Sequence, residues 1–218
     1  ADHGDSHPEN MCRLRWLNST IGSEPDFIIA PFQAVQVSDR TLSILGRDVL
    51  LDVSGLPAQI RSWFTPEMTG LASEPESLLT GPISLFLATA QGRESWTSQP
   101  FQVELESSGR ATWSVHNASP RFDLHTRGAL EYDGMLDYRL ELVAREDVDL
   151  LDVSLPINLK PDVARYMLGL GRRGGRRPQR LDWKWKVEHH QEGLWLGNVH
   201  KGLQYVLRDE NYERPLNT

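Results

Sequence analysis

The sequence predicts an all-β domain: a two-sheet antiparallel β-sandwich with one short helix. Three observations carry this prediction. Apolar and polar residues alternate with a period of two in many short segments. Gly, Pro, Ser and Asp separate these segments at short intervals, and only one segment shows helical spacing. Many short strands of this kind are typical of a sandwich or barrel, and 218 residues suffice for one such domain with a sizeable core.

The first half of the chain contains the clearest hairpin. Its alternation predicts strands at Gln33–Val37, Thr41–Leu45, Asp48–Val53 and Ile83–Ala88. In "FQVELESSGRATWSVH", two alternating runs flank a glycine-containing turn, as in a β-hairpin. The residues that share a face in these two runs are Phe101, Val103 and Leu105, then Ala111, Trp113 and Val115.

The second half continues the pattern. "EYDGMLDYRLEL" predicts a strand with a buried face (Tyr132, Leu136, Tyr138, Leu140, Leu142) and a wet face (Glu131, Asp133, Asp137, Arg139, Glu141). Further strands are expected at Leu150–Ile157, Leu181–Val187, Leu194–Gly197 and Leu203–Leu207. The one helix is expected near Pro161–Leu170, where Val163, Tyr166, Met167 and Leu170 form one stripe. We expect residues 1–12 to be a flexible segment and residues 13–218 to be a single domain.

Composition excludes several classes of function. The formal net charge of −7 disfavours nucleic acid and anionic lipid as partners, and no apolar run approaches the length of a membrane helix. A single cysteine, Cys12, excludes an internal disulfide framework and a cysteine-based zinc site. No cofactor motif is present. The polar start, ADHGDSHPEN, shows no signal-peptide core and favours an excised segment; a soluble protein in either a secreted or a cytoplasmic location stays open.

The tryptophans near the end raise the question of a binding site. In Leu181–Val187, Trp183 and Trp185 share a face with Leu and Val, which favours core over a sugar platform. Trp195 differs, because Leu194 and Leu196 point one way and the indole points the other. A strand that is apolar on both faces is usually covered on both. The second cover could be a neighbouring domain, a loop of this chain or a sugar.

Two polar clusters have plain explanations. His189 and His190 are adjacent, so on a strand they point to opposite faces and do not suit one metal ion; with His200 they are better explained by a solvated turn. The basic run Arg172–Arg177, with Arg180, could bind phosphate or an anionic polysaccharide. Its central Gly-Gly and its lack of interleaved aromatics favour a mobile, soluble loop.

One carboxylate pair has the spacing of a catalytic pair. Residues i and i+2 on a strand lie about 6.8 Å apart, so Glu131 and Asp133 fall near the separation in an inverting glycosidase. Every acidic strand face gives this spacing, and Asp137 and Arg139 continue the same wet face. No sequence motif of a known catalytic or nucleotide-binding site occurs. Glu131 and Asp133 are therefore weak candidates.

Four segments in order resemble a known family: "RLRWLNSTIGSEP", "ILGRDVLLDVSGLPAQIRSWF", "EYDGMLDYRLEL" and "LWLGNVHKGLQYVL" with "YERPL". Together they resemble the N-terminal β-sandwich of proteins similar to glycoside hydrolase family 123, over about Arg13 to Leu216. The resemblance implies a following (β/α)-barrel that carries the catalytic Asp-Glu pair and removes terminal β-linked N-acetylgalactosamine. A barrel needs roughly 200 further residues. No catalytic residue can therefore be carried over to this chain.

The resemblance favours a non-catalytic domain that supports a barrel of the same polypeptide, with a glycan as a further possible partner. An independent carbohydrate-binding module is the alternative, and a self-contained glycosidase using Glu131 and Asp133 is less favoured. In the first case Trp195 anchors the seam with the barrel. Asn198, His200 and Lys201 then form its polar rim.

Overall fold

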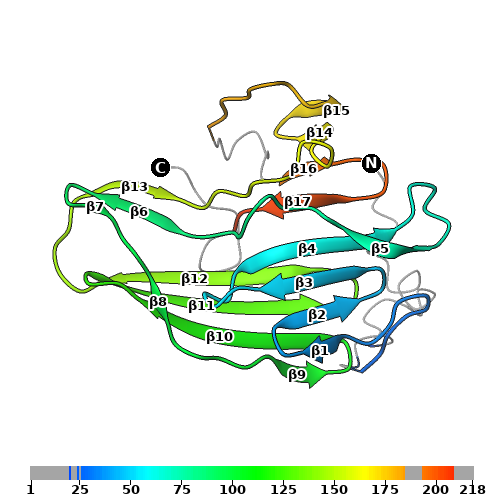
Figure 1. The fold of residues 1–218 in the computed structure, drawn as a ribbon, viewed down its shortest axis with the longest axis horizontal. Helices are drawn as coiled ribbons and strands as arrows, with labels where there is room; N and C mark the ends of the chain where they lie inside the picture. Colours follow the sequence, from blue (N-terminus) through cyan, green and yellow to red (C-terminus); the bar gives the residue numbers. More distant parts are fainter. Residues whose placement is uncertain (1–19, 21–23, 25, 185–192, 209–218) are drawn as a thin grey trace, which may run out of the picture.

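The computed structural model describes residues 20, 24, 26–184 and 193–208. Within these ranges every regular element is a β-strand, and all strand pairs are antiparallel, which confirms the all-β sandwich. Figure 1 shows two large sheets lying against one another, with a smaller sheet at the top of the view and another at its left. The described residues contain no helix long and apolar enough to cross a membrane.

The first large sheet follows the order of the chain, β1-β2-β3-β4-β5. Its strands are β1 (Gln36–Ser38), β2 (Thr41–Ile44), β3 (Arg47–Leu51), β4 (Pro57–Phe64) and β5 (Leu71–Ser77). The second has the order β12-β11-β10-β8, with β9 also paired to β10. Its strands are β8 (Thr97–Ser98), β9 (Glu104–Ser107), β10 (Arg110–Ala118), β11 (Phe122–Glu131) and β12 (Leu136–Ala144).

The main core fills the space between these two sheets. Alternation gives each sheet one apolar face, and burying those faces against each other is what holds the sandwich together. The buried residues come from both sheets: Val35, Leu42, Ile44, Val49, Leu51, Ala111, Trp113, Val115 and Leu130. Tyr132, Leu136 and Tyr138 are partly buried against this cluster, as their shared face predicted.

Trp113 is the largest side chain of this core and is 4% exposed. Its cross-strand neighbour is Gly128, where an added Cβ would lie 2.3 Å from the indole, so only glycine leaves room for the ring. The indole meets the ring of Tyr138 edge to face at 5.7 Å. The indole N–H of Trp113 and the hydroxyl of Tyr138 both donate hydrogen bonds to the carbonyl oxygen of Gly55, at 2.8 Å and 3.2 Å. These bonds tie the loop between β3 and β4 to the opposite sheet.

Two smaller sheets extend the sandwich. One has the order β13-β6-β7, and the other has the order β15-β14-β16-β17. Their strands are β6 (Phe86–Thr89), β7 (Gly92–Arg93), β13 (Leu150–Ser154), β14 (Tyr166–Gly169), β15 (Arg172–Arg176), β16 (Gly193–Gly197) and β17 (Gly202–Val206). A second apolar cluster lies beneath them: Leu56, Ile60, Leu78, Leu79, Ile83 and Val163, with Leu140, Leu159 and Leu203 packed on it.

The helix predicted at 161–170 is wrong. Residues 161–165 form turns, and strand β14 follows at once. The chain then reverses between Gly169 and Gly171, where Leu170 takes a φ of 53°. Val163 and Met167 are both buried, as a helical stripe requires, but the first lies in the turn and the second in the strand. Helical spacing alone did not distinguish these arrangements.

Two strand predictions also need correction. The segment from Glu131 to Leu142 is not one strand, because β11 ends at Glu131, a turn follows, and β12 begins at Leu136. No strand covers residues 181–184, and Trp183 is 36% exposed, so its predicted burial is wrong. Trp185 and the pair His189 and His190 lie outside the described residues, as does the segment 1–12.

Candidate functional site

Trp195 lies on the outer face of the sheet β15-β14-β16-β17. Its cross-strand neighbours are Leu168 on β14 and Gln204 on β17, so these three side chains share one face. Leu194 and Leu196 take the other face, where Leu196 pairs with the buried Met167 and with Leu203, which packs on the second core cluster. The predicted two-faced character of this strand is confirmed. Leu168 is 53% exposed, so the outer face presents apolar surface to solvent.

Part of the cover of Trp195 comes from its own hairpin. A Cβ added at Gly197 would lie 2.3 Å from the indole, and one added at Gly202 would lie 3.0 Å from it. The two glycines therefore leave room for the Trp195 ring and for the close approach of the backbone within the hairpin, since a Cβ at Gly202 would also lie 2.9 Å from the Gly197 Cα. The indole is half-buried as a result.

The predicted polar rim turns out to be an internal ionic cluster. The Lys201 side chain is only 2% exposed, and its Nζ contacts Glu76 Oε2 and, at 3.3 Å, Asp162 Oδ2. His200 Nε2 lies 3.1 Å from Glu76 Oε1. Asn198 donates to the carbonyl oxygen of Asp162 at 3.1 Å. All three predicted rim residues thus fasten the β16–β17 turn to β5 and to the 160–165 turn.

Glu76 is the centre of this cluster. The hydrogen bonds from Lys201 and His200 outweigh partial desolvation and hold the pKa of Glu76 below its ordinary value. Glu76 belongs to β5, in the first large sheet, whereas Lys201 precedes β17. A buried ammonium next to carboxylates is stable only while those partners are kept, so this cluster fixes how the small sheet sits on the sandwich.

The weak catalytic candidates, Glu131 and Asp133, are engaged in the turn between β11 and β12. Glu131 Oε1 accepts from Arg110 Nη1 at 2.5 Å. Asp133 Oδ1 accepts from the N–H of Met135 at 2.8 Å, and its backbone oxygen accepts from Arg47 at 2.9 Å. The two carboxylates do not share one strand, so the spacing argument for a catalytic pair does not apply.

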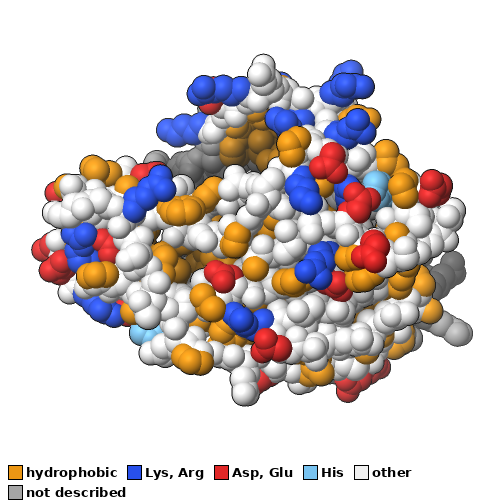
Figure 2. All heavy atoms as spheres, viewed as in Figure 1, with side chains coloured by type: hydrophobic (Ala, Val, Ile, Leu, Met, Phe, Trp, Pro, Cys, Tyr) orange, Lys and Arg blue, Asp and Glu red, His pale blue; other side chains and the backbone are white. Residues whose placement is uncertain are grey.

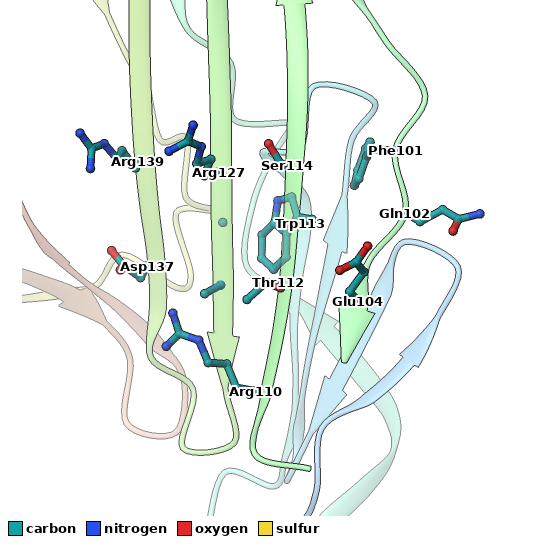
Figure 3. Close-up of a pocket in the computed structure, with 12 residues that line it drawn as sticks. Phe101, Gln102, Glu104, Arg110, Thr112, Trp113, Ser114, Arg127, Asp137 and Arg139 are labelled. Carbon is teal, nitrogen blue, oxygen red and sulfur yellow. The ribbon is translucent and has the colours of Figure 1, made fainter. Parts of the chain in front are cut away.

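A hollow of about 490 Å³ lies on the outer face of β10, β11 and β12. Figure 3 shows Arg127 and Arg139 at the same level of neighbouring strands, with Ser114 on the next strand. Arginines directly opposite each other repel, and no described carboxylate forms an ion pair with either. Asp137 and Glu104 also line the hollow, so its charge is mixed.

The basic run forms a strand, which corrects the predicted mobile loop. Arg172–Arg176 is β15, paired with β14 and exposed along its whole length at the edge of the sheet. Charged side chains on an edge strand oppose edge-to-edge association with another chain. Arg177 Nε donates to the carbonyl oxygen of Ala164 at 2.8 Å, and Arg180 pairs with Asp182 at 2.9 Å. Within the described ranges, no group of three His, Cys, Asp or Glu side chains is arranged to hold a metal ion.

Comparison with models of protein families shows to which family the chain belongs. The family model described as "Glycoside hydrolase 123, third domain" matches residues 35–218, which is most of the chain. The chain belongs to this family. Searches of curated proteins and of solved structures give no significant match. The predicted resemblance to glycoside hydrolase 123 is thus confirmed at the level of the family. The description numbers the domain third, and the N-terminal placement stays a prediction.

Within this glycoside hydrolase 123 third domain, sequence reasoning missed the roles of Glu76 and Asp162. Neither residue stands in a motif, because the contacts with Lys201 join residues 125 and 39 positions apart. The one available signal is local. Lys201 stands in the short turn between two apolar strands, and a lysine can bury its apolar stem in such a place.

Proposed function

We propose that this chain is the non-catalytic β-sandwich domain of a glycoside hydrolase-like protein, and that it packs against and supports a (β/α)-barrel acting on glycans. The observation that carries the proposal is the family match over residues 35–218. Terminal β-linked N-acetylgalactosamine is the substrate that the family resemblance implies for the barrel. Most glycosidases use two carboxylates that flank the scissile bond, whereas the Glu131 carboxylate accepts from Arg110 of β10 and that of Asp133 accepts from the N–H of Met135 in the turn.

The outer face of the sheet β15-β14-β16-β17 is the surface that we assign to the barrel. Leu168 and Trp195 form its apolar part; they pair across β14 and β16, and Met167 on the opposite face of β14 is buried. Apolar side chains at the centre of a polar surface are the usual anchors of an interface. The ionic cluster at Lys201 holds this sheet against the sandwich and so keeps the face in a fixed orientation.

Leu168→Asp tests this seam. Leu168 is 53% exposed, so in the isolated 218-residue chain the change should cost no more than about 0.5 kcal/mol. In the natural polypeptide with its barrel, a buried aspartate would cost about 2 kcal/mol or more. Val53→Asp, at an equally exposed position in the β3–β4 turn, is the control and should be silent in both. Thermal melts of the two variants in both contexts, each compared with the unaltered protein, decide; equal losses for Leu168→Asp in both contexts would place the seam elsewhere.

Catalysis is tested separately on the chain alone. Aryl β-glycosides, including the N-acetylgalactosaminide, should show no turnover above the uncatalysed rate. Turnover that Glu131→Gln or Asp133→Asn abolishes would overturn the non-catalytic assignment, whatever the result at Leu168.

A further inference from the structure

Three arginines surround a second hollow, on the small sheet. It measures about 280 Å³ and is lined by Arg172, Arg173 and Arg176 of β15, together with Met167 and Pro178. Figure 2 shows blue side chains gathered at the top of the molecule, in the region of the small sheet, with orange surface between them. This placement contrasts with the rest of the surface, because the chain as a whole carries a net charge of −7.

The positive charge of the three arginines is not balanced by any described carboxylate in the lining of the hollow. Among the described residues, no carboxylate lines it, and none forms an ion pair with Arg172, Arg173 or Arg176. The hollow on β10–β12 differs in this respect, since Glu104 and Asp137 stand among its arginines. Three arginines that line one hollow attract an anion, and a guanidinium group offers a planar fork that fits two oxygens of a sulfate or carboxylate.

The floor of the hollow adds a second requirement. Met167 is 6% exposed and forms part of the buried face of β14, and Pro178 is half-buried. An apolar floor next to polar donors suits a ligand that has both C–H surface and oxyanions. A sugar ring that carries a sulfate ester or a carboxylate meets both conditions. A bare inorganic ion would leave the floor uncovered.

We propose that β15 and the residues around it form a binding site for an anionic saccharide, with Arg172, Arg173 and Arg176 binding its sulfate or carboxylate group. Nucleic acid fits less well, since none of the described residues that line the hollow is aromatic and able to stack on a base. This site is distinct from the Trp195 face, so the docking role and the binding role can succeed or fail independently.

The test is titration calorimetry of the 218-residue chain at low salt with galactose 6-sulfate, galacturonate and neutral galactose. Saturable binding of at least one acidic sugar is expected, with none for galactose, and the two acids distinguish a sulfate-binding from a carboxylate-binding site. Arg173→Gln with Arg176→Gln should weaken binding about tenfold or more, because charge-assisted hydrogen bonds are lost. Physiological salt should weaken it further.

Arg127→Gln with Arg139→Gln is the matched control. This variant also removes two positive charges, but from the exposed face of β11 and β12. It should leave the affinity for the acidic sugar unchanged. The proposal fails if neither acidic sugar binds, or if both double variants weaken binding equally, which would show an effect of net charge alone. Inorganic sulfate binding as tightly as galactose 6-sulfate would refute a saccharide site. So would a single-stranded oligonucleotide that binds more tightly through the same arginines.

Discussion

Removing the charge of Lys201 should cost far less than removing its two carboxylate partners. The Lys201 ammonium is 2% exposed and contacts both Glu76 and Asp162, which come from β5 and from the 160–165 turn. The carboxylates themselves are largely in water, since the Glu76 side chain is 48% exposed and that of Asp162 is 62% exposed. Leaving the buried ammonium without a partner should therefore reduce the free energy of unfolding far more than leaving the solvated carboxylates without one.

The magnitudes follow from this asymmetry. Lys201→Met keeps an unbranched stem in the same space and leaves two carboxylates that water can solvate, so the loss should be at most about 1 kcal/mol. Glu76→Gln with Asp162→Asn leaves a buried ammonium without a negative partner, and breaking a buried pair in this way costs about 3–5 kcal/mol. Adding Lys201→Met to that double variant should recover most of the loss.

Urea unfolding of the four proteins measures these differences as shifts of the midpoint at constant m value. The double carboxylate variant should unfold at clearly lower urea than the Lys201→Met variant, and the triple variant should lie between the double variant and the unaltered chain. If Lys201→Met alone costs as much as the double change, the buried charge is a net source of stability and the reasoning is refuted.

Three further results are expected. Gly128→Ala should destabilise by about 1–3 kcal/mol, because its Cβ would lie 2.3 Å from a buried indole, whereas Gly175→Ala, with nothing within 4 Å, should be silent in the same thermal melts. The lowered pKa of Glu76 means that its contribution is present above pH 4.5, its ordinary value, and is lost as pH falls through the lower folded value. Glu76→Gln should therefore flatten the fall in Tm below pH 4.5. Arg139→Glu, opposite Arg127, should stabilise the chain by about 0.2–1 kcal/mol, an effect that high salt removes.

The sandwich core could be predicted because alternation determines which side chains share a face. Trp113 and Tyr138 were placed correctly on this basis, and they meet edge to face. Strands β4 and β5 were missed, since Pro57 begins one and Pro75 interrupts the other, and the pairing between them shifts register between Ser62 and Phe64. Prolines and bulges break the period of two on which the prediction depends.

The candidate site was less predictable, for a different reason. A lysine in a turn is expected to be solvated, and only the tertiary fold brings carboxylates from distant segments to Lys201. The prediction of a mobile loop for the arginine run was wrong for the same kind of reason. Its two glycines indicated a loop, yet β14 offers a free edge with which Arg172–Arg176 pairs, and that pairing fixes the arginines around a hollow.

Both proposed surfaces belong to one four-stranded sheet, and this has a consequence for how the protein would handle a glycan. A barrel seated on Leu168 and Trp195 would cover the middle strands, β14 and β16, while β15 lies at the edge of the sheet. The arginine hollow, floored by Met167 on the opposite face of β14 from Leu168, would then lie at the edge of the sheet and stay uncovered beside the partner domain. A saccharide held there by its acidic group would be kept close to the barrel. The sandwich would thus add affinity for an acidic part of the glycan without contributing to bond cleavage.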